Sequence, residues 1–302
     1  MEEKILREQI TSTGVELLQD GLVARTWGNV SARLDEKRFL ISPSGLDYKQ
    51  TKPEDLALYN MEDDTWEGPR KPSSEKGVHG AAYAIFKDVN FVIHTHQAYA
   101  SAISVAGFDK LDITDEEKDF LGGIALADYG LPGTGKLKKA VKSAFEKGAK
   151  TILMKHHGAV ICGASKEEAY AKALKLEEIC KRNCKGLVEG EAAALTLANQ
   201  GKEIYACLDD MAQMIGKKVP LVSKEKMEEA LNSKNAVLVK GIGAEVNGMD
   251  EDDTKALEIL VEKAAITQVH ANALGVNGKL SSLDCLIMNF VYKQKYSKMK
   301  EK

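Results

Sequence analysis

Five of the six histidines in this 302-residue chain lie in three short segments, one of which also contains a glutamate. The segments are residues 73–79 (Ser-Ser-Glu-Lys-Gly-Val-His), 92–96 (Val-Ile-His-Thr-His) and 154–158 (Met-Lys-His-His-Gly). Imidazoles and one carboxylate, with a position left open for substrate, are what a catalytic zinc site needs. Histidines scatter in a random chain, whereas here only His270 lies outside these segments. The clustering therefore indicates an enzyme that binds a divalent metal.

The spacing of the histidines fits that chemistry. His94 and His96 follow the apolar run 91–93, which predicts a buried strand, and side chains two residues apart on a strand point to one face. His156 and His157 follow a second apolar run, so they too stand at the end of a strand. We expect His94, His96 and one residue of the pair to bind the ion, while the other is a core or supporting histidine.

Glu75 allows two interpretations. It can serve as the carboxylate of the metal site, or it can begin a helix as part of a cap with an acidic first turn, which composition alone favours. Small polar residues in short turns supply hydroxyl and backbone N–H groups that suit a phosphate, although they are also ordinary turn residues. These turns are Gly28-Asn29, Ser44-Gly45 and Ser73-Ser74.

The composition argues against several other classes of protein. The formal net charge is −3, and basic residues are spread along the chain, so no nucleic-acid partner is expected. No apolar run approaches the ~18 residues of a membrane span. The charged start lacks the apolar region of a signal peptide, and five cysteines without framework spacing favour reduced thiols. We therefore expect a cytoplasmic protein without a membrane partner.

Helical and strand patterns alternate along the first 185 residues. Apolar spacing predicts helices over residues 3–20, 79–86, 99–105, 136–147 and 165–183. It predicts strands over residues 26–34, 38–41, 56–59, 91–93, 151–154 and 158–162. This mixture, on a sheet that is mainly antiparallel, predicts an α+β or three-layer α/β/α domain.

The remainder of the chain contains a segment whose pattern is similar to that around His156. Residues 152–163 and 237–248 share an apolar strand, a Gly-containing turn and a following helix, at an offset of 85 residues. In this register His156 falls on Gly241 and His157 on Ile242, so the second copy lacks the ligands. Chance is the alternative, since strand, turn and helix recur in any α/β protein. We predict a catalytic domain over residues 1–188 and a C-terminal extension over 189–302 with a partial, degenerate, ligand-free repeat.

Five motifs in order resemble the class II aldolase/adducin family, and in particular its L-fuculose-1-phosphate aldolase and L-ribulose-5-phosphate 4-epimerase branches. The motifs are residues 27–31, 41–45, 72–79, 92–96 and 156–158, and the resemblance covers about residues 4–187. It implies a three-layer α/β/α domain of the class II aldolase type. Because members are commonly four-fold symmetric tetramers, it also implies a homo-oligomer.

The resemblance assigns roles to the matching residues. His94, His96 and His157 would ligate zinc, or another divalent metal such as Mn²⁺ or Co²⁺. Glu75 would ligate the metal in the empty site and act as acid/base when substrate displaces it. The phosphate cradle would comprise Gly28, Asn29, Ser44, Gly45, Ser73 and Ser74. The supporting, non-ligand positions would be those of His79 and His156.

The implied activity is zinc-dependent retro-aldol cleavage of a sugar phosphate to dihydroxyacetone phosphate and an aldehyde. A pentulose-5-phosphate 4-epimerase with the same retro-aldol step is the alternative. Glu75 matches the aldolase, whereas the flanks of Asn29 and His94 resemble the epimerase more. Asp119 is a further candidate as the epimerase's second catalytic residue, and Tyr129 lies near the position of the aldolase's substrate-facing tyrosine. A non-enzymatic, adducin-like scaffold is a third option, against which the complete set of metal-site residues argues.

Overall fold

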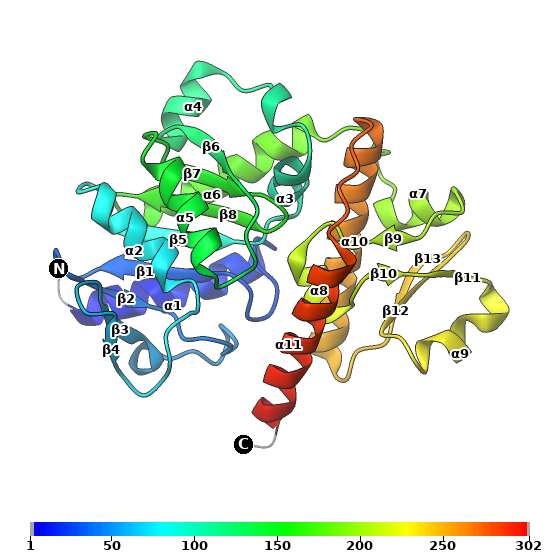
Figure 1. The fold of residues 1–302 in the computed structure, drawn as a ribbon, viewed down its shortest axis with the longest axis horizontal. Helices are drawn as coiled ribbons and strands as arrows, with labels where there is room; N and C mark the ends of the chain where they lie inside the picture. Colours follow the sequence, from blue (N-terminus) through cyan, green and yellow to red (C-terminus); the bar gives the residue numbers. More distant parts are fainter. Residues whose placement is uncertain (1–2, 301–302) are drawn as a thin grey trace. The chain divides into compact units, whose positions relative to one another are not determined.

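The computed structural model describes residues 3–300, which form two compact units. Unit 1 comprises the residues up to Ala100 together with Asp112–Ile179, and unit 2 comprises Ser101–Leu111 and the residues from Cys180 onward. Figure 1 shows unit 1 in blue to green and most of unit 2 in yellow to red. Within the described range, no helix has the length and hydropathy required to span a membrane.

Unit 1 is built on an eight-stranded sheet of order β4-β3-β2-β1-β5-β8-β7-β6. Its strands are β1 (Asn29–Arg33), β2 (Arg38–Ile41), β3 (Ala57–Asn60), β4 (Thr65–Glu67), β5 (Phe91–Thr95), β6 (Ile124–Ala127), β7 (Thr151–Met154) and β8 (Gly158–Gly163). Neighbouring strands are antiparallel except for the parallel pair β6–β7. The predicted mainly antiparallel sheet is confirmed.

Helices complete three layers in unit 1. They are α1 (Glu3–Gln19), α2 (Lys76–Ile85), α4 (Asp115–Leu121), α5 (Gly135–Phe145) and α6 (Lys166–Asn183), with the short η1 (Pro53–Asp55). Helices α2 and α5 pack on one face of the sheet, where Val78 and Val141 join sheet residues such as Ile152 in one apolar core. Figure 1 shows these two helices in front of the strands and α6 behind them. The predicted α/β/α architecture is confirmed.

The predicted elements of unit 1 agree with the structure to within a few residues, and three others were missed besides the short η1. Strands β2 and β7 match their predicted ranges, because each is an apolar run bounded by turns. The sequence patterns did not predict β4, β6 or α4. All residues of β4 are exposed, and β6 is an edge strand that is mostly half-buried, so neither carries a clear apolar pattern.

Unit 2 contains two small sheets, of order β10-β9 and β11-β12-β13. Its elements are η2 (Phe108–Lys110), α7 (Ala193–Asn199), β9 (Ile204–Tyr205), α8 (Asp209–Met214), β10 (Lys218–Val219), β11 (Leu221–Val222), η3 (Lys224–Lys226), α9 (Met227–Leu231), β12 (Ala236–Val239), β13 (Gly243–Val246), α10 (Glu251–Ala273) and α11 (Ser282–Lys300); α3 (Ala98–Val105) runs into it from unit 1. Helix α10 carries much of its core, with Leu257, Val261 and Ala265 fully buried.

Candidate active site

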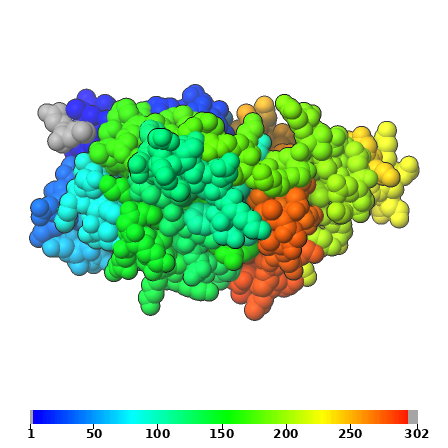
Figure 2. Space-filling view, turned by 90° about the horizontal axis from the view of Figure 1, so that it is seen from above, coloured from blue at the N-terminus to red at the C-terminus, as the bar shows by residue number. Residues whose placement is uncertain are grey.

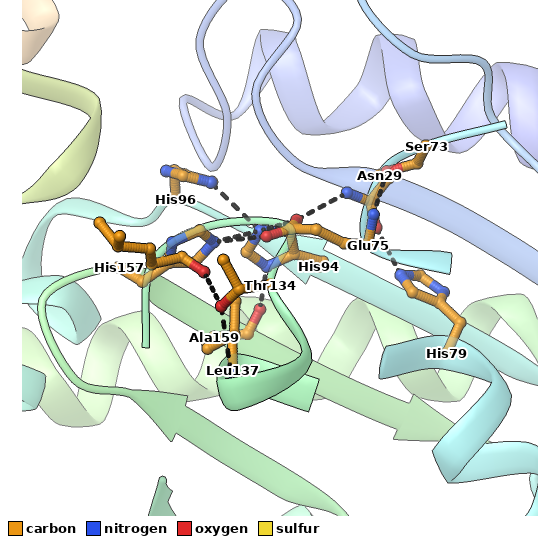
Figure 3. A network of polar contacts seen from close by, with 11 residues as sticks. Asn29, Ser73, Glu75, His79, His94, His96, Thr134, Leu137, His157 and Ala159 are labelled. Atoms are coloured by element: carbon orange, nitrogen blue, oxygen red, sulfur yellow. Dashed lines mark hydrogen bonds and ion pairs between the residues drawn. The ribbon is translucent and has the colours of Figure 1, made fainter. Parts of the chain in front are cut away.

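Three histidines from two strand ends meet at one point of unit 1 (Figure 3). His94 is near the end of β5, His96 lies just beyond that strand, and His157 is in the turn between β7 and β8. Because β5 pairs with β8, the two ends are adjacent, with His94 opposite Val160. His94 Nε2 lies 3.1 Å from His96 Nε2 and 3.0 Å from His157 Nε2. All three side chains are buried.

A backbone contact fixes which nitrogen of His94 faces this cluster. His94 Nδ1 lies 2.8 Å from the carbonyl oxygen of Ala159, which can only accept, so Nδ1 carries the hydrogen. In the neutral ring Nε2 then holds a lone pair, and that lone pair faces the other two imidazoles. A histidine whose second nitrogen donates to a carbonyl is the usual arrangement for a metal ligand.

Glu75 completes the cluster. It occupies the N-cap position of α2, yet its side chain makes no capping hydrogen bond. Instead Oε2 lies 3.0 Å from His94 Nε2, and Oε1 lies 3.2 Å from His157 Nε2. Oε1 is buried and accepts no hydrogen bond from the described residues. The carboxylate is therefore directed at the histidines, and helix capping does not explain its position.

These donor atoms fit a divalent cation. Four ligands placed tetrahedrally around zinc at its usual bond lengths lie about 3.3 Å from one another, close to the separations seen here. Burial alone would raise the pKa of the Glu75 carboxyl, but the positive charge that His94 and His157 carry when protonated outweighs it and holds that pKa well below its ordinary value. One nitrogen of each of the three imidazoles lies within 4.8 Å of the others, and the anionic carboxylate approaches two of them.

The three turns expected to hold phosphate lie at the same end of the sheet, because β1 begins where β2 ends. Gly28 has a φ of 78°, and a Cβ there would come within 2.6 Å of the His94 carbonyl oxygen, so only glycine fits. The turn after β2 is tied to the one before α2 by Ser44 N–H, which donates to Lys71 O at 2.9 Å. Ser73 Oγ accepts from Glu75 N–H at 3.2 Å, while Ser74 is exposed.

Asn29 has a different environment from the one expected for a phosphate ligand. It is buried, and its Nδ2 lies 3.1 Å from Glu75 Oε2. Its Oδ1 makes a short hydrogen bond with His79 Nε2. His79, predicted to play a supporting role, is fully buried and reaches Glu75 through this amide.

The remaining predicted residues are Tyr129, His156 and Asp119. The rings of Tyr129 and His156 pack edge to face, 5.4 Å between centres, and His156 has a left-handed φ of 65°. Asp119 is exposed on α4, and no interaction among the described residues joins it to the cluster. A cavity of about 180 Å³ reaches Glu75 and is lined by Lys76, Thr134 and Lys138, among others.

Two residues of the site were missed by sequence reasoning. Ser31 and Tyr83 continue the chain of contacts beyond His79. Glu75, His79 and Tyr83 are spaced four apart, which places them along one face of a helix, and this signal was available in the sequence.

The comparisons with known proteins agree with this geometry. The sequence model of the class II aldolase and adducin N-terminal domain matches residues 8–184. A 5-deoxy-D-ribulose 1-phosphate aldolase from Bacillus thuringiensis serovar kurstaki is 35% identical over 175 residues, which cover 57% of this chain and 80% of that protein. An L-ribulose-5-phosphate 4-epimerase from Salmonella paratyphi C is 32% identical over 189 residues, covering 58% of this chain and 82% of the epimerase.

A solved structure shows the same relationship. An L-fuculose 1-phosphate aldolase superposes with a TM-score of 0.54 at 25% identity, covering 59% of this chain and 84% of that chain. Fold and site together define a metal-dependent enzyme of the class II aldolase type. The chain belongs to the class II aldolase and adducin family, in which its relatives are sugar-phosphate aldolases and epimerases.

Proposed function

We propose that this protein is a zinc-dependent aldolase that cleaves a ketose phosphate to dihydroxyacetone phosphate and an aldehyde. The observation that carries the proposal is the Glu75 carboxylate, held within 3.2 Å of two imidazole nitrogens of a three-histidine cluster. A glutamate at this position matches the aldolase pattern, and a relative named 5-deoxy-D-ribulose 1-phosphate aldolase supports the substrate class.

The residues of the site would have separate roles in metal binding and proton transfer. When bound, a divalent ion supplies positive charge that polarises the substrate and stabilises the negative charge left by carbon–carbon cleavage. His94, His96 and His157 would hold that ion, and the His94–Ala159 contact orients the first of them. Glu75 is anionic and adjacent, so it can take a proton from, or return it to, the reacting carbon.

Substrate binding and the aldehyde side follow from the surrounding groups. The turns at Gly28, Ser44-Gly45 and Ser73-Ser74 would receive the phosphate through N–H and hydroxyl groups. Tyr129 and His156, which pack against each other and of which His156 directly precedes His157 in the sequence, would serve the aldehyde end.

An epimerase of pentulose 5-phosphates is the second candidate function. The 32% identical epimerase supports it. Its second acid would be Asp119, which lies exposed on α4. An Asp119→Asn variant that retains full turnover is expected for the aldolase, whereas loss of turnover would favour the epimerase.

The enzyme is further proposed to be cytoplasmic and a homo-oligomer. In the part of α11 whose side chains the structure describes, residues 282–294, five exposed apolar side chains recur at helical spacing: Leu283, Leu286, Ile287, Phe290 and Val291. Its opposite face packs through the buried Cys285 and Met288. An apolar stripe of this size marks an interaction surface, and a second copy of α11 would match it. Light scattering should show that Phe290→Ser lowers the mass; an unchanged mass would rule out this surface.

One assay tests the function directly. Purified, zinc-loaded protein should release dihydroxyacetone phosphate from at least one member of a panel of pentulose and hexulose 1-phosphates. Interconversion of pentulose 5-phosphates without triose release would identify the epimerase instead. Failure with both classes would revive the non-enzymatic scaffold.

A further inference from the structure

Five polar groups form one continuous chain from the core of unit 1 to Glu75. Tyr83 Oη lies 2.7 Å from Ser31 Oγ, and Ser31 Oγ lies 2.6 Å from His79 Nδ1. His79 Nε2 meets Asn29 Oδ1, and Asn29 Nδ2 lies 3.1 Å from Glu75 Oε2. Figure 3 shows the last three members, with Asn29 between His79 and the carboxylate. The chain links β1 to α2 beside the candidate metal site.

The direction of every hydrogen bond in this chain follows from the carboxylate. An ionised carboxylate only accepts, so the Asn29 amide nitrogen must donate to Glu75. The amide oxygen is thereby left facing His79, and because it can only accept, His79 Nε2 must carry a hydrogen. The neutral ring then accepts at Nδ1 from the Ser31 hydroxyl, whose oxygen in turn accepts from Tyr83.

Burial keeps the hydrogen-bonded groups between Tyr83 and Asn29 uncharged. Ser31, His79 and Tyr83 are completely buried. Desolvation lowers the pKa of His79 to about 3, and burial raises the pKa of Tyr83, so both are neutral near pH 7. Hydrogen bonds that run in one direction through a low-dielectric interior polarise and strengthen one another.

We propose that His79 is a positioning residue that fixes the Asn29 amide, and through it the Glu75 carboxylate, in the orientation required for proton transfer. A flipped amide would turn its oxygen against the carboxylate and its N–H₂ against the His79 N–H. When Glu75 gains a proton during turnover, the carboxylate no longer dictates the orientation of the amide. His79 still does, because its Nε2–H continues to need an acceptor.

This inference rests on the proposed acid/base role of Glu75. The alternative is that His79 is only a core histidine whose hydrogen bonds are satisfied. Another buried histidine of this protein, His270, shows what such a residue looks like. His270 in unit 2 is also buried, accepts from Lys185 N–H at 2.9 Å and donates to Ala106 O at 3.0 Å. It has the same tautomer, but its partners are backbone atoms and no side chain extends the contact.

Two substitutions separate positioning from packing. A glutamine places its amide nitrogen where Nε2 lies, so His79→Gln retains a donor to Asn29. An asparagine reaches only as far as Nδ1, so His79→Asn loses that donor. We expect His79→Asn to lower kcat about 10–100-fold, as loss of an orienting partner does, with KM little changed, while His79→Gln recovers most of kcat. Equal losses in both variants at equal folded fraction would overturn the proposal.

A spectroscopic measurement on the full-length, zinc-loaded protein needs no assay. Nitrogen-15 NMR of the imidazoles should show His79 protonated at Nε2 and unprotonated at Nδ1 throughout pH 5–8, with the signal assigned by its absence in His79→Gln. The Nδ1–H tautomer, or titration within that range, would overturn the proposed orientation. If the wild type instead lacks both aldolase and epimerase activity, the proposed function fails while the tautomer result stands.

Discussion

Two hairpins of this molecule have the same strand-pairing register and different chemistry. In unit 1, β7 pairs with β8, and Met154 lies opposite Gly158; in unit 2, β12 pairs with β13, and Val239 lies opposite Gly243. Every paired residue of the second hairpin is offset from the first by 85. Each hairpin has a parallel neighbour on its first strand, β6 or β11, and each is followed by a long helix.

The turns also correspond. His156 and Gly241 both have left-handed backbone, with φ of 65° and 78°. The next residue in each turn, His157 or Ile242, donates its N–H to the last strand residue at 3.0 or 3.1 Å. On these grounds we propose that residues 189–302 carry a degenerate, ligand-free copy of the last third of the catalytic domain, as the similar sequence pattern predicted.

The two hairpins differ in the burial of the turn and in the strand next to it, and these differences explain why only the hairpin of unit 1 contributes to the candidate metal site. His157 is 2% exposed, whereas Ile242 is 41% exposed. Strand β8 is paired on its far side with β5, which supplies His94 and His96, whereas β13 is the last strand of its sheet. The hairpin therefore presents only one ligand, and the other groups come from β5, which supplies His94 and His96, and from the start of α2, which supplies Glu75.

The largest effect is expected at the second residue compared in the two turns, which is His157 in unit 1 and Ile242 in unit 2. We expect His157→Ala to lower both zinc occupancy and turnover by several orders of magnitude, because it removes one of three imidazole donors. The matched variant Ile242→Ala should leave metal content and kcat unchanged. Metal analysis and steady-state kinetics test both variants. A zinc-loaded, active His157→Ala enzyme would show that His157 is not a required ligand.

A smaller effect is expected for the Glu75 carboxylate, which has no counterpart in the hairpin of unit 2. Glu75→Gln should retain much of the metal through the three histidines, yet lose about 10²–10⁴-fold in kcat, the range of general acid–base catalysis. Near-normal kcat would show that the carboxylate does not transfer the proton. Loss of metal in parallel with kcat would indicate that Glu75 acts as a ligand only.

The smallest effect concerns the two left-handed positions. A residue with a Cβ is strained there by about 1 kcal/mol, whereas glycine is not. His156→Gly should therefore stabilise the protein by about 1 kcal/mol, and Gly241→Ala should destabilise it by a similar amount. Chemical denaturation checks both, and a destabilised His156→Gly variant would show that the contact of the ring with Tyr129 outweighs the backbone strain.

Much of unit 1 was predictable because its strands are apolar runs that end in chemically distinctive residues. The run before His94 and the run before His156 predicted β5 and β7, and the motif order resembled one family. The link from Glu75 to Tyr83 was not predicted, because it passes through Asn29 and Ser31, which are about fifty residues away in sequence. The approach of such residues is decided by the packing of α2 against β1, which spacing in the sequence does not reveal.

Unit 2 was less predictable for a different physical reason. Strands β9, β10 and β11 contain two residues each, too few for an alternating pattern to emerge. In the sequence, only the hairpin, the helix after it and the helical segment 224–231 before it had a visible counterpart in unit 1. The family match ends at residue 184, so resemblance added nothing beyond it.

The most direct test of this account is the anomalous scattering of a zinc-loaded crystal of the full-length protein. One ion per chain is predicted, about 2.0–2.1 Å from the Nε2 atoms of His94, His96 and His157, with none near residues 236–246. In His96→Ala crystals that peak should be lost or strongly reduced. A wild-type crystal without an ion at the three histidines, or a full peak in His96→Ala, would contradict the central claim.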